Sequence, residues 1–230
     1  MRLYSGLLVF VLALLTGCAT GSSGGNGGLP NIAKSNIDEV IEIHQQVVMH
    51  DLKKLMIKLY LRNPALRHDR DLRSIKASVE MTFSRAFDYN YPQWQAISNP
   101  TDIVRLALDE HYQGDRVLAF IVGLRKMLMA SYDNHLDFFY LTSIDQQKLY
   151  NSARNIEIAA WLLAEKRDSK GNLLLLSDSL GNEQRNLSFQ RLIGRMIATQ
   201  DNLAKIIAQK NGRIIKTFVV QAASMVFLPI

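Results

Sequence analysis

The stretch that decides the fold is DRVLAFIVGLRKMLMASY, residues 115–132. Its first half is hydrophobic on nearly every side of a helix, which is typical of a helix buried at the centre of a protein. Asp115 opens this helix, and Gly123 lies inside it at a cost of about 1 kcal/mol relative to alanine. We therefore expect a central helix that a neighbouring element approaches closely at Gly123.

The segments before this helix also follow the helical period. From Asn36 to about Asn63, apolar residues recur at three- and four-residue steps, and Pro64 closes the segment. A second helix is predicted to start at Asp69 or Asp71. The apolar faces of the two helices are Ile37, Ile41, Val48, Leu52, Leu55 and Leu59 in the first, and Leu72, Ile75, Val79, Phe83 and Ala86 in the second.

Two further helices are marked by their starting residues. Asn99-Pro100-Thr101-Asp102 combines a capping residue, a proline and an acid, and it predicts a short helix that ends near Tyr112. Ser143-Ile144-Asp145-Gln146 has the spacing of a capping box, and it predicts a helix that runs to about Lys166.

The last third of the chain contains two more predicted helices. One begins at Asn186 or Ser188 and ends at Asn211-Gly212, and the other covers about residues 213–226. The chain shows no βαβ alternation, no strong hairpin signal and no internal repeat. We therefore predict an all-α fold: a single domain over residues 35–230 with six or seven packed helices.

The first thirty residues have a different character. An arginine at position 2 is followed by an apolar run that is too short to span a membrane, and then by Leu15-Thr16-Gly17-Cys18. This tetrad resembles the lipobox of bacterial lipoproteins. The resemblance implies that residues 1–17 are a cleaved signal peptide and that Cys18 receives acyl chains. Ala19 then favours the outer membrane, facing the periplasm, over the inner membrane.

A flexible tether is expected to follow the lipidated cysteine. Residues 18–34 are rich in glycine and serine, which have maximal backbone freedom and no core-forming side chains. Since Cys18 is the only cysteine, its acylation would leave no thiol for catalysis, disulfide formation or metal binding. The formal net charge of +6 suits contact with an anionic surface. The basic residues are not clustered as in a nucleic-acid-binding protein, and the chain contains no nucleic-acid-binding motif, so we expect no nucleic acid partner.

The sequence contains only weak candidates for a reactive site. Asp133, His135 and Asp137 are close together and are candidate metal ligands, although a helix end and a solvated turn explain them equally well. Glu110 and His111 are a candidate acid–base pair without a partner motif. Because no known catalytic, phosphate-binding or metal-binding motif is present, we predict no enzymatic activity and no cofactor.

Three sets of residues are candidate contact surfaces. A basic set on the first helix would face lipid headgroups or phosphates, unless it is simply a solvated helix face. An aromatic loop and the apolar C-terminal segment would contact a partner, unless they pack into the core. The basic set is Lys53, Lys54, Lys58 and Arg62; the aromatic and apolar set is Tyr89, Tyr91, Trp94 and Phe227.

Three functions follow from these observations. The first is a lipid-anchored, non-enzymatic accessory or scaffold subunit of the bacterial cell envelope that contacts other envelope proteins. The second is a binding module for an apolar or amphipathic ligand, held between helices near Phe120, Phe138, Phe139 and the methionines. The third, an envelope hydrolase, requires the weak acidic and histidine candidates to converge in one cleft. The sequence leaves the oligomeric state open.

Overall fold

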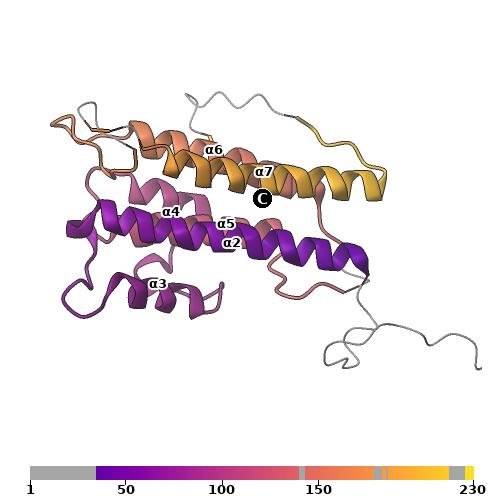
Figure 1. Ribbon diagram of the computed structural model, residues 1–230, viewed down its shortest axis with the longest axis horizontal. Helices are drawn as coiled ribbons and strands as arrows, with labels where there is room; N and C mark the ends of the chain where they lie inside the picture. The colour runs from indigo at the N-terminus through magenta and orange to yellow at the C-terminus, as the bar shows by residue number, and fades with distance from the viewer. Residues whose placement is uncertain (1–34, 140–142, 179–182, 185, 218–225) are drawn as a thin grey trace, which may run out of the picture. The chain divides into compact units, whose positions relative to one another are not determined.

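The computed structural model describes residues 35–139, 143–178, 183–184, 186–217 and 226–230. Within these residues the structure contains six α-helices and no strand, and the helices pack as one compact unit (Figure 1). The all-α prediction is therefore confirmed. The helices are α2 (Asn36–Arg62), α3 (Ile75–Ser84), α4 (Pro100–Ala107), α5 (Arg116–Ser131), α6 (Gln146–Glu165) and α7 (Ser188–Asn211), with short 3₁₀ turns η2 (Pro64–Leu66) and η3 (Pro92–Trp94).

Helix α5 is the central element, as its sequence predicted. It packs most closely on α4 and also contacts α2 and α6. At Gly123, a Cβ atom would lie 2.7 Å from Val104 Cγ2 and 2.9 Å from the Val104 backbone nitrogen. The close approach expected at this glycine is therefore confirmed, and its partner is α4.

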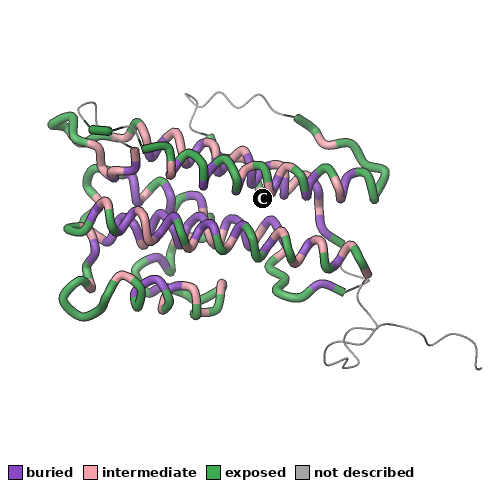
Figure 2. Tube along the Cα trace, viewed as in Figure 1, coloured by how far each residue is buried: buried purple, intermediate pink, exposed green. Residues whose placement is uncertain are grey.

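The long helices α2, α6 and α7 lie side by side around α5. Helix α7 packs along both α2 and α6, and α3 packs on the other side of α2 (Figure 1). Figure 2 shows that each long helix turns one buried side inward and one exposed side outward. This pattern is the amphipathic period from which the helices were predicted.

Buried polar side chains join the three helices α5, α6 and α7. Gln200 of α7 accepts a 2.6 Å hydrogen bond from the hydroxyl of Tyr132, just past the end of α5. Its amide donates to the hydroxyls of Ser131 (3.1 Å) and Ser152 of α6 (2.6 Å). Both serine hydroxyls donate in turn to helix carbonyls, so the network is satisfied without water.

Two arginines of α5 bind the carbonyl ends of neighbouring helices. Arg125 donates to the carbonyls of Thr82, Phe83 and Arg85 at the end of α3. Arg116 donates to the carbonyls of Ala107 at the end of α4, and of Asp109 and Glu110 beyond it. The last carbonyls of a helix have no partner within the helix, so these guanidinium groups replace a missing cap. Burial lowers the pKa of both arginines.

Several predicted helix starts agree with the structure. Asn99 caps α4 and Asp115 caps α5 through their side-chain oxygens. Gly212 ends α7 with a φ of 61°, the left-handed conformation expected of an Asn-Gly end.

Other predicted boundaries are wrong. The cap of α6 is Asp145 rather than Ser143, because the Asp145 carboxylate accepts from the Gln147 N–H. Helix α4 ends at Ala107, well before Tyr112. Helix α3 starts only at Ile75, and Leu72 lies outside it with 78% of its surface exposed.

The predicted C-terminal helix is also wrong where it can be compared. Residues 213–217 and 226–230 are not helical, and residues 218–225 lie outside the described part of the chain. Residues 226–230 instead lie along α6 with Phe227 buried.

Candidate functional site

A pocket of about 400 Å³ opens between the end of α2, the loop before α3 and the start of α5. We call it the Asp115 pocket. Its size is within the range of small-molecule sites, and most of its lining is apolar. It is lined by Tyr60, His68, Asp69, Arg73, Ser78, Met81, Thr82, Gln93, Trp94, Tyr112, Gly114, Asp115 and Leu118.

Asp115 is the buried acid of this pocket. As the cap of α5 it accepts from the Leu118 N–H at 2.8 Å through Oδ1. Its Oδ2 accepts from the Tyr60 hydroxyl at 2.9 Å and from the His68 N–H at 3.4 Å. Burial raises the pKa of Asp115, and these three hydrogen bonds oppose the rise. Among the described residues no lysine or arginine forms an ion pair with it.

Tyr60 connects this acid to the core. Its ring is 2% exposed on the buried side of α2, and its hydroxyl reaches the Asp115 carboxylate. Burial and the neighbouring carboxylate raise the pKa of Tyr60 far above its usual range. Tyr60 is therefore a permanent hydrogen-bond donor to Asp115 rather than a base.

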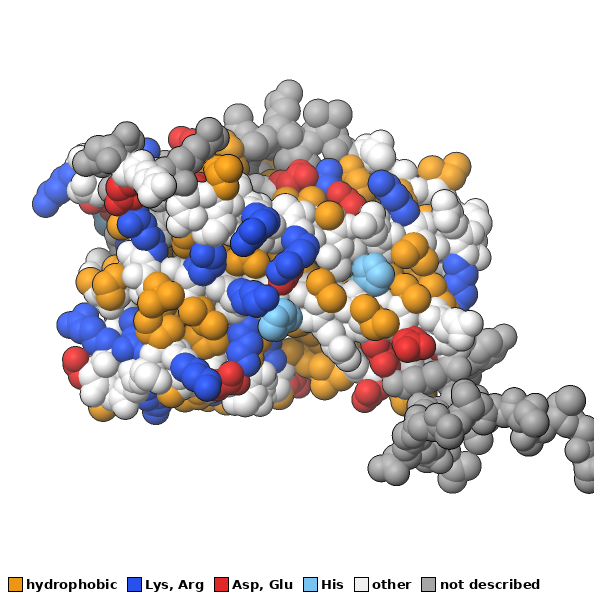
Figure 3. Space-filling view, viewed as in Figure 1, with side chains coloured by type: hydrophobic (Ala, Val, Ile, Leu, Met, Phe, Trp, Pro, Cys, Tyr) orange, Lys and Arg blue, Asp and Glu red, His pale blue; other side chains and the backbone are white. Residues whose placement is uncertain are grey.

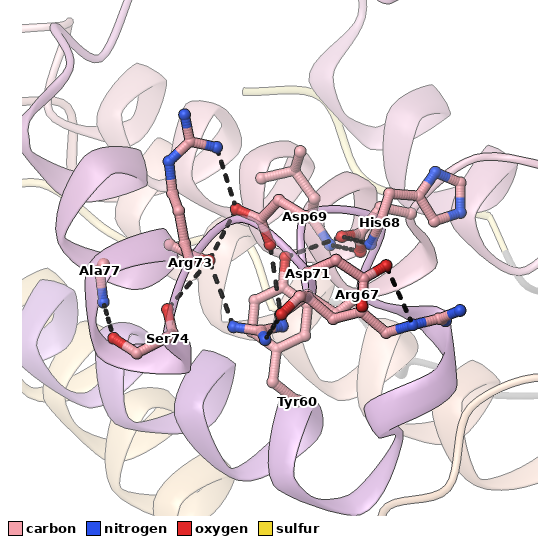
Figure 4. Close-up of polar contacts among 12 residues, drawn as sticks. Tyr60, Arg67, His68, Asp69, Asp71, Arg73, Ser74 and Ala77 are labelled. Carbon is pink, nitrogen blue, oxygen red and sulfur yellow. Dashed lines mark hydrogen bonds and ion pairs between the residues drawn. The ribbon is translucent and has the colours of Figure 1, made fainter.

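A second acid, Asp69, lies in the loop between η2 and α3 (Figure 4). Its Oδ2 accepts from the Ser78 hydroxyl at 2.7 Å and from Arg73 at 3.4 Å. Its Oδ1 lies 3.7 Å from Arg67 Nε and has no hydrogen bond among the described residues. This buried acceptor atom therefore has an ion-pair contact but no hydrogen bond among the described residues.

The remaining wall is aromatic and apolar. Trp94 of η3 is 4% exposed and stacks at a tilt on Tyr91, with ring centroids 5.1 Å apart. Tyr112 folds over Gly114, where a Cβ atom would lie 2.2 Å from the tyrosine hydroxyl. Gly114 is therefore required for the position of Tyr112, and burial raises the pKa of that hydroxyl.

The polar groups of the Asp115 pocket are engaged mainly in hydrogen bonds with one another. The Ser78 hydroxyl donates to Asp69 and is not paired with an imidazole among the described residues. Within the same residues no three His, Cys, Asp or Glu side chains are grouped as metal ligands would be. The pocket offers two carboxylates as acceptors beside apolar and aromatic walls.

The structure does not bring the predicted metal ligands together. Asp133 stands in a left-handed turn and forms an ion pair with Lys148 at 2.6 Å. His135 and Asp137 are exposed, and the three do not form a cluster. Glu110 and His111 are exposed as well, and hydrogen bonding from the Ser169 side chain and from its N–H lowers the pKa of Glu110. These weak candidates are explained as turn and surface residues.

The predicted basic set is divided between paired and unpaired residues. Lys53 pairs with Glu80 at 2.7 Å, and Arg62 pairs with Glu183. Lys58 lies 5.0 Å from the ring centroid of Phe189, and no ion pair joins it or Lys54 to a carboxylate of the described residues.

Most of the predicted partner-contact set is buried. Tyr91 and Trp94 belong to the core, and Phe227 is 9% exposed. These three side chains therefore pack their segments against the domain and do not form an open surface. Tyr89 is more exposed, but it is covered by the Arg85 guanidinium at 4.5 Å. Phe120 and Phe138 are fully buried, Phe139 is 40% exposed, and none of the three lines the Asp115 pocket. Cys18 lies outside the described residues.

Comparison with protein-family models, with curated proteins and with solved structures gave no match for this chain. Among the described residues, none of the helices combines the length and the apolar character needed to cross a membrane.

Proposed function

We propose that the chain is a lipid-anchored, non-enzymatic binding protein of the bacterial cell envelope. In this proposal Cys18 is the anchor, and the helical domain binds a small amphipathic ligand in the Asp115 pocket. The observation that carries the proposal is the buried Asp115 carboxyl, which faces a largely apolar pocket and forms no ion pair with a lysine or arginine of the described residues.

The pocket specifies the chemistry of the ligand. A buried carboxylate is costly unless a cation or several hydrogen bonds compensate it. Asp115 has hydrogen bonds but no ion pair with a lysine or arginine of the described residues, and Asp69 Oδ1 accepts no hydrogen bond there, although Arg67 Nε lies 3.7 Å from it. A protonated amine supplies both charge and donors, and Trp94, Tyr112 and Leu118 provide surface for an apolar body. The proposed ligand is therefore a primary amine with an apolar chain or ring.

The test uses the fluorescence of Trp94. The chain has two tryptophans, so Trp161→Phe in the full chain makes Trp94 the single reporter in the pocket. Probes are n-alkylamines of increasing length, with alkyl alcohols and alkyl carboxylates of equal length as comparisons. We expect saturable changes in Trp94 emission with the amines only. Equal responses to the three head groups would refute a carboxylate-directed site.

A pair of matched variants locates the response. Asp115→Asn keeps a side chain that can cap α5 but removes the charge, and we expect amine affinity to fall at least tenfold. Asp71→Asn makes the same chemical change in the loop before α3, at a side chain that is 88% exposed and does not line the pocket. That control should bind like the parent chain, and a loss as large as that of Asp115→Asn would contradict the proposal.

The anchor has a separate test. Cys18→Ala should leave the chain unprocessed and free of acyl groups, as measured by mass spectrometry and by its release from membranes in cell fractionation. Normal processing and unchanged membrane retention of this variant would refute the lipoprotein proposal without touching the pocket.

A scaffold role is the second candidate function, and the outer side of α2 favours it. Lys54 is exposed there, together with Val47 (38% exposed) and Leu61 (64% exposed). Figure 3 shows basic and hydrophobic side chains gathered over α2 and α7. Such a mixed face suits an envelope protein or anionic headgroups. Crosslinking in intact cells, with and without Leu61→Asp, tests it; identical crosslinks would contradict a role of this face.

A further inference from the structure

Helix α6 presents a row of amide side chains along one face. Gln147, Asn151 and Asn155 are spaced by four residues, so they lie one above the other. Gln147 Nε2 donates to Asn151 Oδ1 at 2.9 Å, which fixes the orientation of both amides. We call these three residues the amide ladder.

The amide ladder binds backbone groups of the C-terminal part of the chain. Asn155 donates to the Leu228 carbonyl at 2.9 Å and accepts from the Leu228 N–H at 2.7 Å. Asn151 donates to the Pro229 carbonyl at 2.8 Å. Gln147 makes the same two-way pair with Lys216, at 3.0 Å and 2.8 Å. The ladder therefore binds main-chain groups of two non-helical segments, independently of the side chains that these segments carry.

Side-chain recognition comes from an adjoining depression between α4 and α5. Phe227 is buried there, and the Arg105 guanidinium lies 4.8 Å from the centroid of its ring. Space of about 480 Å³ remains beside the segment, lined by Pro100 and Thr101 of α4, Met127 and Ala130 of α5, and residues 227–230. This depression shares no lining residue with the Asp115 pocket.

We propose that the amide ladder and this depression form a docking site for an extended peptide. Residues 226–230 occupy it as an internal ligand. The external ligand is a segment of another polypeptide that carries an aromatic residue, an aliphatic residue and a proline in the order of Phe227, Leu228 and Pro229. Proteins that bind extended peptides generally form hydrogen bonds with the peptide main chain and provide pockets for alternate side chains.

The internal ligand is held by few contacts. Within residues 226–230 Phe227 is buried, Leu228 and Ile230 are half-buried with Ile230 packed against the core, and Val226 and Pro229 are exposed. Three hydrogen bonds from two asparagines hold its backbone. Because only one of its side chains is fully buried, we expect this segment to open locally more readily than the packed helices. An external segment with the same features therefore competes with it directly.

The test uses a fluorescent pentapeptide, Val-Phe-Leu-Pro-Ile, and the full chain. Phe227→Ala weakens the internal ligand but leaves the amide ladder and the depression unchanged. We expect the peptide to bind this variant at least tenfold more tightly than the parent chain, measured by fluorescence anisotropy. A peptide with alanine in place of phenylalanine should bind neither protein.

A second pair of variants, built on Phe227→Ala, assigns the binding to the ladder. Asn155→Ala should remove peptide binding, and Asn202→Ala, at an exposed position of α7, should not. If circular dichroism shows that Asn155→Ala does not fold, Asn155→Asp is used instead. The aspartate keeps the acceptor for the Leu228 N–H and loses the donor to the Leu228 carbonyl. Absence of peptide binding to Phe227→Ala, or binding that ignores Asn155, overturns the proposal. A dimer that exchanges its C-terminal segments, seen by sedimentation, overturns the external partner in favour of a second copy.

Discussion

Replacing Gly123 with alanine is the sharpest test of the packing at the centre of the domain. A Cβ atom at this position would meet the Val104 nitrogen at 2.9 Å and the Pro100 carbonyl at 3.0 Å. Because both atoms belong to the backbone, a rotation of the Val104 side chain cannot relieve the overlap. Helix α4 must move away from α5, and its whole contact surface with α5 moves with it.

The magnitude follows from two opposing contributions. Overpacking a tightly packed interface costs about 1–3 kcal/mol, and a backbone clash belongs at the upper end of this range. Alanine in a helix interior recovers about 1 kcal/mol relative to glycine. We therefore expect Gly123→Ala to lower the free energy of unfolding by about 2 kcal/mol, which corresponds to a fall in Tm of roughly 4–8 °C for a domain of this size.

Gly194 provides the matched control. It also lies inside a helix, α7, but a Cβ atom there would meet nothing within 4 Å. Gly194→Ala should therefore gain the helix-propensity contribution without a clash and stabilise the domain by about 0.5–1 kcal/mol. Thermal unfolding followed by circular dichroism at 222 nm compares the two variants. If both glycines shift Tm in the same direction, or if Gly123→Ala is neutral, the close contact between α4 and α5 is not as described.

Three further predictions concern buried polar groups. Gln200→Leu leaves the Tyr132 hydroxyl buried without its acceptor and should cost about 1–3 kcal/mol in urea unfolding, with part of the loss recovered in the double variant with Tyr132→Phe. Arg125→Met leaves the carbonyls at the end of α3 without donors, so amide hydrogen exchange in α3 should accelerate while exchange in α7 stays unchanged. Asp115 has a raised pKa in the folded state, so its contribution to stability is present at low pH and is lost as pH rises; Asp115→Asn should flatten the fall in urea midpoint as pH rises above about 4, the usual pKa of an aspartate. An unchanged pH profile would show that Asp115 is not a buried acid.

The helices could be predicted because their information is local. The period of apolar residues located α2, α5 and α7, and the residues Asn99, Asp115 and Gly212 marked ends that the structure confirms. The cap of α6 was misassigned because Ser143 and Asp145 both satisfy a local capping pattern. Which of them caps the helix is decided by how the chain enters α6, and this is a tertiary property.

The start of α3 and the Asp115 pocket were missed for a common reason. The stretch around Arg67, Asp69 and Arg73 shows its charge in the sequence, but the pairing of these residues with each other and with Ser78 needs the folded loop. Those contacts hold residues 69–73 as a turn, so α3 begins after Ser74 and Leu72 points to solvent. The mixture of acids and arginines between two helices was the only signal of this site.

The C-terminal segment shows a related limit. Its apolar composition is compatible with a helix, with a buried strand-like segment and with an exposed contact surface. What selects the observed form is the amide ladder of α6, more than sixty residues earlier, because Asn155 pairs with both backbone groups of Leu228. A helix would already have used these backbone groups internally, and the asparagine would then have been left buried without partners.

Helix α5 links the two proposed sites to the stability of the fold. Its first turn carries Asp115, its middle holds α4 at Gly123, and its last turns supply Met127 and Ala130 beside Phe227. A displacement of α4 therefore changes the depression at one end of α5, while Asp115 keeps its contacts with Tyr60 at the other. At temperatures below unfolding, Gly123→Ala should weaken peptide binding in the Phe227→Ala background and leave amine binding at Trp94 unchanged. Equal losses at both sites would mean that α5 transmits the displacement along its whole length, and the two sites would then be coupled.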